Sequence, residues 1–292
     1  MKEQFIDEEK YKAHLYQILK YFISICKKHN LTYCCATGTM LGAVRHKDII
    51  PWDDDVDVFM PRKDYEKLLT LAKEIDGEGF GLISANNCPS YATFAKLYNK
   101  STTLWEMESI PFVYGVYIDV FPLDETSDNK DTFIKKYHYF RNLFRKYQLS
   151  QINFSIKRLI DDIKEGDKKM VIKEILSIFM PSFMSDYYRY KIIEFEKKAA
   201  LGKGGHLVSY YGDYWGREYF DKKWFDNYVD MPFSDFTVKV PAGYHEYLSN
   251  VYGNYMKFPP VEKRISHHYH YYLNMDKGMT IEEVRKIMKN NS

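Results

Sequence analysis

Apolar residues recur three or four positions apart near the start of the chain. This spacing over residues 7–28 predicts an amphipathic helix that ends at His29-Asn30. The apolar positions are Tyr11, Leu15, Ile18, Leu19, Phe22, Ile25 and Cys26.

Short apolar runs with alternating polar positions predict strands further along. Residues 55–60 alternate carboxylates with apolar side chains until Pro61 ends the strand, and a helix with one apolar side is expected over 64–72. Residues 114–122 form a second acidic strand, closed by Pro122-Leu123-Asp124-Glu125. Further strands are expected at 31–36, 82–84, 93–98 and 238–241.

The middle of the chain has a different pattern. Residues 128–198 consist of helix formers with many Lys and Arg, and a Gly/Tyr-rich loop follows over 202–216. The basic helices are typical of solvated surfaces, but they also fit an anionic membrane or an acidic polymer. The patterns divide the chain into a core over 1–127, a helical and aromatic insertion over 128–236, and a C-terminal segment over 237–292 that returns to the core.

Four carboxylates crowd into five residues at Asp53, Asp54, Asp55 and Asp57. Strand alternation places Asp55 and Asp57 on one face, roughly 6–7 Å apart at their Cα atoms, while Val56 and Val58 face a core. Such a pair repels itself unless a cation neutralises it, and oxygen ligands favour Mg²⁺ or Mn²⁺. The alternative is a solvated acidic turn.

Asp119 lies within the second acidic strand, among Val116, Ile118, Val120 and Phe121. An unpaired carboxylate there is costly, so we expect Asp119 to complete the metal site. Lys96 also lies on an apolar strand, where it needs either an anionic partner or a path to solvent.

Gly38 lets the backbone approach a ligand closely, and the helix that begins after it offers its N-terminus to phosphate. Arg45 adds a cation nearby. A tight turn with no ligand is the other interpretation of Gly38, which the acidic strand downstream makes less favourable.

Composition narrows the class of protein. The 292 residues carry a net charge of +2, too small to indicate non-specific nucleic-acid binding, so we expect no nucleic-acid partner. No signal peptide or bilayer-spanning run is recognisable. The four cysteines lack metal spacing and are expected to be small buried hydrophobes in a reducing cytoplasm. The 27 Tyr and 19 Phe suit sugars, nucleobases or quaternary ammonium groups, although they also suit an ordinary core.

Taken together, the Gly-Thr turn, the Asp-x-Asp strand and the later Asp119 resemble the polymerase-β type nucleotidyltransferase superfamily. The string from Gly38 to Val58 resembles the LicD family more specifically, the bacterial phosphocholine transferases related to fukutin and fukutin-related protein. The segments 94–103, 118–122 and 240–268 agree with this family. The resemblance implies an α+β fold, a mixed sheet flanked by helices with a helical, aromatic-rich insertion.

The resemblance also implies an activity: transfer of a phospho-alcohol, typically phosphocholine, from CDP-choline or another CDP-alcohol to a sugar hydroxyl of a cell-surface glycan such as teichoic acid, releasing CMP. Asp55, Asp57 and Asp119 would be the catalytic and metal-binding residues. Gly38, Thr39, Arg45 and Lys96 would bind the donor phosphates. The acceptor would be lipid-linked or free, and the protein would work in the cytoplasm or at the inner face of the membrane with peripheral contact. The family's zinc module is not recognisable here.

Three features stay open at the level of sequence. Lys263, Arg264, His267 and His268 form either a second anion or acceptor site or a polar helix end. The loop with Tyr210-Tyr211 and Tyr214-Trp215 is a candidate aromatic cage. Two other functions compete: nucleotidyl transfer to a sugar or small molecule with pyrophosphate release, and an inactive scaffold that keeps the fold. Three retained carboxylates argue against the scaffold.

Overall fold

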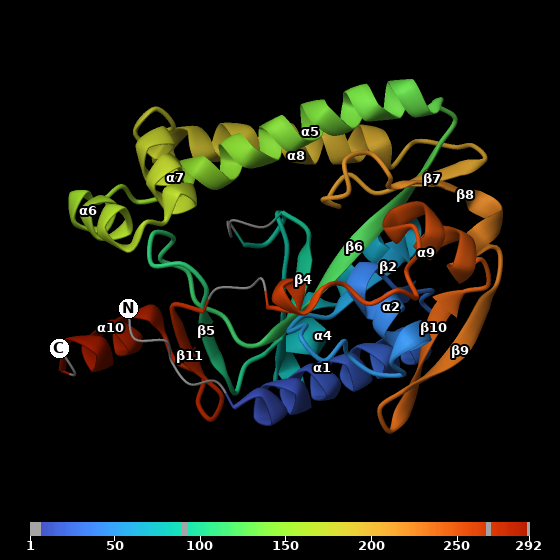
Figure 1. The fold of residues 1–292 in the computed structure, drawn as a ribbon, viewed down its shortest axis with the longest axis horizontal. Coiled ribbons are helices and arrows are strands. Elements are labelled where there is room, and N and C mark those ends of the chain that lie inside the picture. Colours follow the sequence, from blue (N-terminus) through green and yellow to red (C-terminus); the bar gives the residue numbers. More distant parts are fainter. Residues whose placement is uncertain (1–6, 89–92, 267–269, 291–292) are drawn as a thin grey trace.

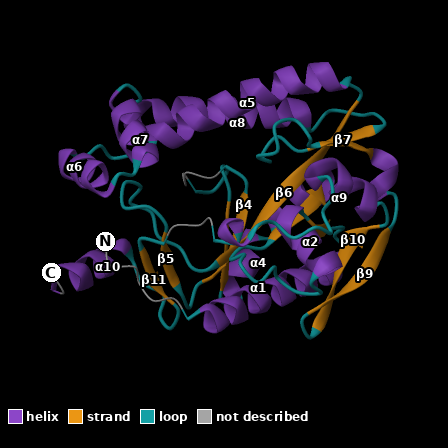
Figure 2. Ribbon diagram, in the orientation of Figure 1, coloured by secondary structure: helices purple, strands orange, loops and turns teal. Residues whose placement is uncertain are grey.

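A mixed sheet forms the centre of the fold (Figures 1 and 2). The structure, a computed structural model, describes residues 7–88, 93–266 and 270–290. Within these residues the sheet has the order β1-β2-β6-β4-β3, and β7 and β8 continue it beside the far end of β6. Strands β2 and β6 are parallel and the other neighbours are antiparallel. The strands are β1 (Cys34–Cys35), β2 (Asp57–Pro61), β3 (Phe80–Ile83), β4 (Ala95–Asn99), β6 (Tyr117–Thr126), β7 (His206–Val208) and β8 (Tyr219–Asp221).

Helix α1 (Glu8–His29) packs on one face of this sheet. The Asp7 carboxylate accepts a hydrogen bond from the Lys10 backbone N–H, and Asn30 ends the helix in the left-handed conformation. Its buried residues are the apolar positions that the helical spacing predicts, so that prediction is confirmed.

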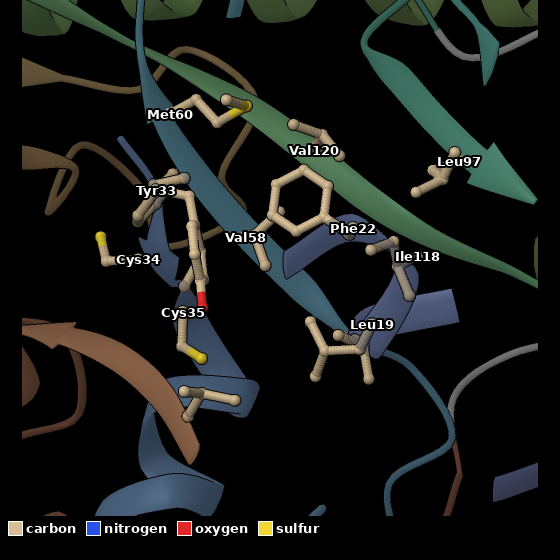
Figure 3. Packing of buried hydrophobic residues seen from close by; sticks show 14 of the residues in the cluster. Leu19, Phe22, Tyr33, Cys34, Cys35, Val58, Met60, Leu97, Ile118 and Val120 are labelled. Carbon is tan, nitrogen blue, oxygen red and sulfur yellow. The ribbon is translucent and has the colours of Figure 1, made fainter. Parts of the chain in front are cut away.

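Strand alternation gives the sheet two chemically different faces. Val58, Ile118 and Val120 turn toward α1 and join Leu19 and Phe22 in the main hydrophobic core (Figure 3). Asp57 and Asp119, one residue away on the same strands, turn toward the opposite face. The functional groups therefore stand on a surface whose rear is a packed core.

A layer of helices lies over that opposite face, along the top of Figure 1. Its long members α5 (Lys130–Ser150) and α8 (Ser185–Ala199) pack against each other and share an aromatic core with Tyr210 and Tyr211. Helices α6 (Ile156–Glu165) and α7 (Lys168–Ile178) form a hairpin at one end, followed by the 3-10 turn η1 (Ser182–Met184). The helical insertion is thus observed.

Shorter elements complete the chain. They are α2 (Thr37–Arg45), α3 (Arg62–Thr70), α4 (Ala72–Gly77), β5 (Thr103–Trp105), η2 (Lys222–Phe225), β9 (Tyr228–Phe233), β10 (Phe236–Pro241), α9 (Tyr244–Tyr252), η3 (Val261–Lys263), β11 (Tyr272–Asn274) and α10 (Ile281–Asn290). Strands β9 and β10 form a hairpin, and β11 pairs with β5. The expected α+β class is confirmed.

Three sequence predictions are wrong in detail. Strand β6 does not end at Pro122 but runs to Thr126. The Pro122 nitrogen, which lacks a hydrogen to donate, points away from β2, and neither β4 nor β7 pairs with β6 at this residue. The proline therefore removes no hydrogen bond from the sheet. The Gly/Tyr-rich loop contains strand β7. The segment 238–241 lies in β10 but is not the last strand, since β11 follows it.

Two expectations drawn from the composition can be compared with the structure. Cys26, Cys34 and Cys35 are buried with free thiols, as expected, whereas Cys88 is partly exposed. Among the helices that the structure describes, none combines the length and the hydrophobicity needed to cross a bilayer.

A carboxylate-lined candidate active site

Two cavities meet at Asp55 and Asp57. The first, which we call the aromatic cavity, has a volume of about 350 Å³ and lies between the sheet and α5. The second, the arginine cavity, has a volume of about 530 Å³ and lies between the start of α2 and the segment after α9. Their shared wall consists of Thr37, Asp55, Asp57, Asp213 and Tyr214.

The acidic strand delivers its carboxylates as the alternation predicts. Asp55 and Asp57 line the same cavities, while Val56 and Val58 are buried. Asp119 stands opposite Asp57 in the parallel β2–β6 ladder and lines the aromatic cavity. Asp55 lies just before β2, which begins at Asp57, so the three candidate metal ligands come from β2, from β6 and from the segment that leads into β2, and they face one space.

The aromatic cavity is strongly acidic. Asp55, Asp57 and Asp119 share its wall with Glu106, Asp213 and Glu218, and the described residues of the lining include two cationic side chains, Lys96 and Arg141. Burial raises the pKa of the nearby Tyr214 hydroxyl, and the negative charges of Asp57, Asp55 and Asp53 raise it further. This potential favours a cationic occupant.

Lys96 has an anionic partner, which is one of the two alternatives that its sequence context left open. Its side chain is 2% exposed, and its ammonium donates a hydrogen bond to the Asp119 carboxylate at 2.8 Å. The ammonium also lies 3.5 Å from the centroid of the Tyr117 ring. Lys96 thus holds Asp119 in the cavity wall.

Thr37 occupies the junction with a strained backbone. Its φ of 40° is rare for a β-branched residue, and such conformations concentrate at functional sites. Its hydroxyl donates to the Asp57 carboxylate, and its N–H donates to the Tyr247 hydroxyl. Thr37 was not among the predicted site residues, because nothing in the sequence Thr-Gly-Thr reveals which threonine faces the carboxylates.

Helix α2 begins at Thr37, before Gly38 and not after it as the sequence predicts, and Gly38 and Thr39 in its first turn have different environments. Gly38 lines the arginine cavity, where an added Cβ would approach the Asp53 carboxylate to 2.7 Å. Thr39 is buried, and its hydroxyl accepts a hydrogen bond from the Asp57 backbone N–H at 2.8 Å. Thr39 positions the start of β2.

Arg45 lies in the arginine cavity and is shared with the C-terminal segment. It donates to the Tyr255 carbonyl at 2.7 Å, and its guanidinium lies 4.8 Å from the Phe258 ring centroid. Arg264 lies 5.4 Å from the same ring, and 5.2 Å from the Trp52 ring. Burial lowers the Arg45 pKa, Tyr252 opposes this shift, and the charge of Arg264 adds a smaller lowering.

Most of the remaining predicted site residues do not line either cavity or lie outside the described residues. Lys263 is exposed in η3, outside the lining of either cavity. His267 and His268 lie outside the described residues. Of the candidate cage, Tyr211 and Tyr214 line the aromatic cavity, Tyr210 packs in the helical core and Trp215 is 80% exposed.

The donor set suits a divalent ion of the magnesium type. In the described part of the chain, no three His, Cys, Asp or Glu side chains gather tightly enough to hold an ion unaided. However, Mg²⁺ is commonly held by one or two carboxylates together with substrate phosphates and water. Asp55 and Asp57 meet that requirement at the wall that both cavities share.

A carboxylate pair at the start of a strand of a mixed sheet, beside a helix N-terminus, is the arrangement of a nucleotidyltransferase-like domain. Comparison with known proteins agrees: residues 30–158 match the sequence model of the LicD/FKTN/FKRP nucleotidyltransferase domain. These residues are a LicD-family domain, and the family expected from the sequence is confirmed.

Two relatives extend the comparison. The Haemophilus influenzae lipopolysaccharide cholinephosphotransferase LicD is 28% identical over 256 residues, which cover 86% of this chain and 92% of that protein. An uncharacterized Rickettsia typhi protein is 31% identical over 138 residues, covering 45% of this chain and 41% of its own length. Because the first alignment covers 86% of this chain, it includes at least part of the helical layer as well as of the core.

Proposed function

We propose that this protein transfers phosphocholine from CDP-choline to a sugar hydroxyl of a cell-surface glycan such as teichoic acid, with release of CMP. The Haemophilus relative, whose name describes choline-phosphate transfer to lipopolysaccharide, supports the choice of head group. The observation that carries the proposal is the pair of chemically different cavities that meet at Asp55 and Asp57.

The arginine cavity suits the nucleotide half of the donor. Trp52 and Tyr252 offer rings to a cytosine, and Arg45 and Lys257 offer positive charge to phosphates. The first turn of α2, with Gly38 in the wall, presents a helix N-terminus to the same groups. The diphosphate would then reach the shared wall.

The aromatic cavity suits a quaternary ammonium group. Phe94 and Phe121 lie 4.6 Å apart at their ring centroids, and Tyr211 lies 5.1 Å from Phe94. Phe144 of α5 adds a fourth ring. Rings combined with surrounding carboxylates attract a cation that offers no N–H donors, which describes choline.

Asp55 and Asp57 would hold a magnesium ion, which supplies charge neutralisation to the donor diphosphate. The acceptor oxygen forms a bond to the phosphorus that carries choline, the bond from that phosphorus to the CMP oxygen breaks, and CMP departs with the electron pair. Asp119, which stands beside Asp57 in the ladder and lines the aromatic cavity, would either help to bind an ion or receive the proton of the acceptor hydroxyl. Lys96 fixes the Asp119 position and adds positive charge.

Product analysis tests the proposal. The full chain is incubated with Mg²⁺, a glycan acceptor and CDP-choline labelled either in choline or in cytidine. We expect the choline label in the glycan, the cytidine label in CMP, and no transfer once a chelator removes the divalent ion. Cytidine label in the glycan would instead establish nucleotidyl transfer and overturn the proposal.

A further inference from the structure

The α6–α7 hairpin carries apolar stripes that nothing in the described chain covers. In α6, Ile156, Ile160 and Ile163 follow helical spacing on one side and are 66%, 46% and 58% exposed. In α7, Ile172 and Ile175 are 56% and 43% exposed. Phe179 and Phe183, which follow α7, are 73% and 82% exposed. An apolar stripe normally faces a core, so this concentration on one hairpin points to a binding surface.

The hairpin buries polar groups instead. The Glu174 side chain is fully buried and accepts a hydrogen bond from Arg158 of α6 at 2.8 Å. Ser177, the other buried residue of α7, is polar as well. Because the polar sides of the two helices face each other, the apolar sides remain available to an apolar environment.

The layer that carries this hairpin is the basic part of the molecule. Residues 128–200 contain 16 Lys and Arg against 10 Asp and Glu, whereas the rest of the chain contains 26 against 30. Amphipathic helices on a basic layer are the composition of segments that lie in the headgroup region of an anionic bilayer. A second copy of the chain would bring like charges together, which disfavours a dimer through this layer.

The hairpin is also connected to the site. Arg141, Phe144 and Gln148 of α5 line the aromatic cavity, and α5 ends two residues later, beside the hairpin (Figure 1). The face of α5 that forms the cavity wall thus leads toward α6 and α7.

We propose that the α6–α7 hairpin, with Phe179 and Phe183, inserts shallowly into the surface of an anionic lipid bilayer. The aromatic cavity would then lie close to glycans carried by lipids in that bilayer. This consequence for the acceptor rests on the proposed function, but the lipid contact itself does not, because it is measurable without turnover.

Vesicle flotation of the full chain tests the contact, with phosphatidylcholine vesicles compared with vesicles that also contain phosphatidylglycerol. We expect flotation with the anionic vesicles, weakened by salt. The double substitution Phe179→Ser/Phe183→Ser should weaken partitioning at least about tenfold, given the free energy of burying two Phe side chains. The matched control is Leu201→Ser, because Leu201 is 81% exposed but follows the opposite end of α8.

Each outcome of these measurements supports or overturns the proposed bilayer contact. Wild-type protein that stays unbound, or a double variant that floats like wild type, would overturn the proposal. A wild-type dimer in solution that the double variant turns into a monomer would assign the surface to a second copy. Circular dichroism confirms that the variants fold, which exposed positions should permit. Loss of flotation with normal choline transfer to a water-soluble acceptor would separate this contact from the chemistry.

Discussion

Asp57 connects several parts of the site through one residue. Its carboxylate accepts from Thr37, its backbone N–H donates to Thr39, and Asp119 lies beside it in the ladder. It also stands in the wall shared by both cavities. A change at Asp57 therefore acts where the two substrates would meet.

The substitution Asp57→Asn should lower choline transfer by about 10²–10³-fold or more, because an amide oxygen neutralises a bound cation less well than a carboxylate. The fold should persist with an unchanged or higher melting temperature, since one of several repelling carboxylates is removed. Choline transfer and thermal melting measure the two effects.

The control is Asp54→Asn, because Asp54 lines neither cavity and accepts a hydrogen bond from Ser266. That variant should retain activity. Equal turnover by wild type and Asp57→Asn would contradict the assigned role of Asp57.

At the scale of single residues, the sequence predicted the positions of the acidic site residues better than those of the other residues that line the cavities. Strand parity alone places Asp55 and Asp57 on one face and Val56 and Val58 in the core. Arg141 and Glu218 reach the site from segments far away in the sequence, so their positions depend on tertiary packing. The roles assigned to the predicted site residues stay predictions.

Helix α2 depends on a close contact at Gly42. A Cβ at this position would approach the Asp48 carbonyl oxygen to 2.4 Å, and that oxygen belongs to backbone rather than to a flexible side chain. The contact fixes the turn that leads from α2 to the acidic strand.

We expect Gly42→Ala to reduce the free energy of unfolding by about 1–3 kcal/mol, because the turn must shift to admit a methyl group. Chemical denaturation measures the change. Gly77→Ala is the matched control, since a Cβ at Gly77 meets nothing within 4 Å. That variant should be neutral or more stable by up to about 1 kcal/mol, from helix propensity. Similar stabilities for the two variants would contradict the importance of the contact.

Among the elements, long periodic ones were the most predictable. The spacing of apolar residues specifies the buried face of α1 without any knowledge of its neighbours. Strands β7 and β11 are each three residues long and exist through pairing with distant strands, so no local pattern indicates them. The prediction that β6 ends at Pro122 was wrong for a related reason: the missing N–H of a proline matters only where a neighbouring strand would accept a hydrogen bond from it.

At the scale of the whole molecule, one buried polar cluster joins the helical layer to the core. Arg62 of α3 donates two hydrogen bonds to Asp124 of β6, at 2.7 and 2.8 Å. Glu196 of α8 lies 3.6 Å from the same guanidinium. Burial raises the pKa of the Glu196 carboxyl to about 7, although the charge of Arg62 opposes this shift.

This pKa predicts how stability depends on pH. The folded protein keeps a proton on Glu196 that the unfolded chain releases near pH 4.5, so the contribution of Glu196 to stability falls as the pH rises from about 5 to 7. The substitution Glu196→Gln removes this loss. The stability of the variant relative to wild type should rise by on the order of 1–3 kcal/mol between pH 5 and pH 8, measured by denaturant unfolding at each pH.

The control for this prediction is Glu194→Gln on the same helix. Lys198 and Lys191 lower the pKa of the exposed Glu194 carboxyl to about 2, so its ionisation is complete below pH 5. The relative stability of that variant should stay constant between pH 5 and pH 8. A parallel change in both variants would show that Glu196 is not the group responsible.

Because the site has two cavities, different residues line its two parts, and each set of residues can change without the other. Phe94, Phe144 and Tyr211 contact the aromatic cavity alone, whereas Arg45 and Trp52 contact the other alone. Under the proposed function, substitutions in the first set would change which alcohol is transferred without changing the contacts to the nucleotide. If that assignment holds, a lineage with this architecture would change the group that it adds to surface glycans through a handful of substitutions, with the same nucleotide carrier and the same chemistry.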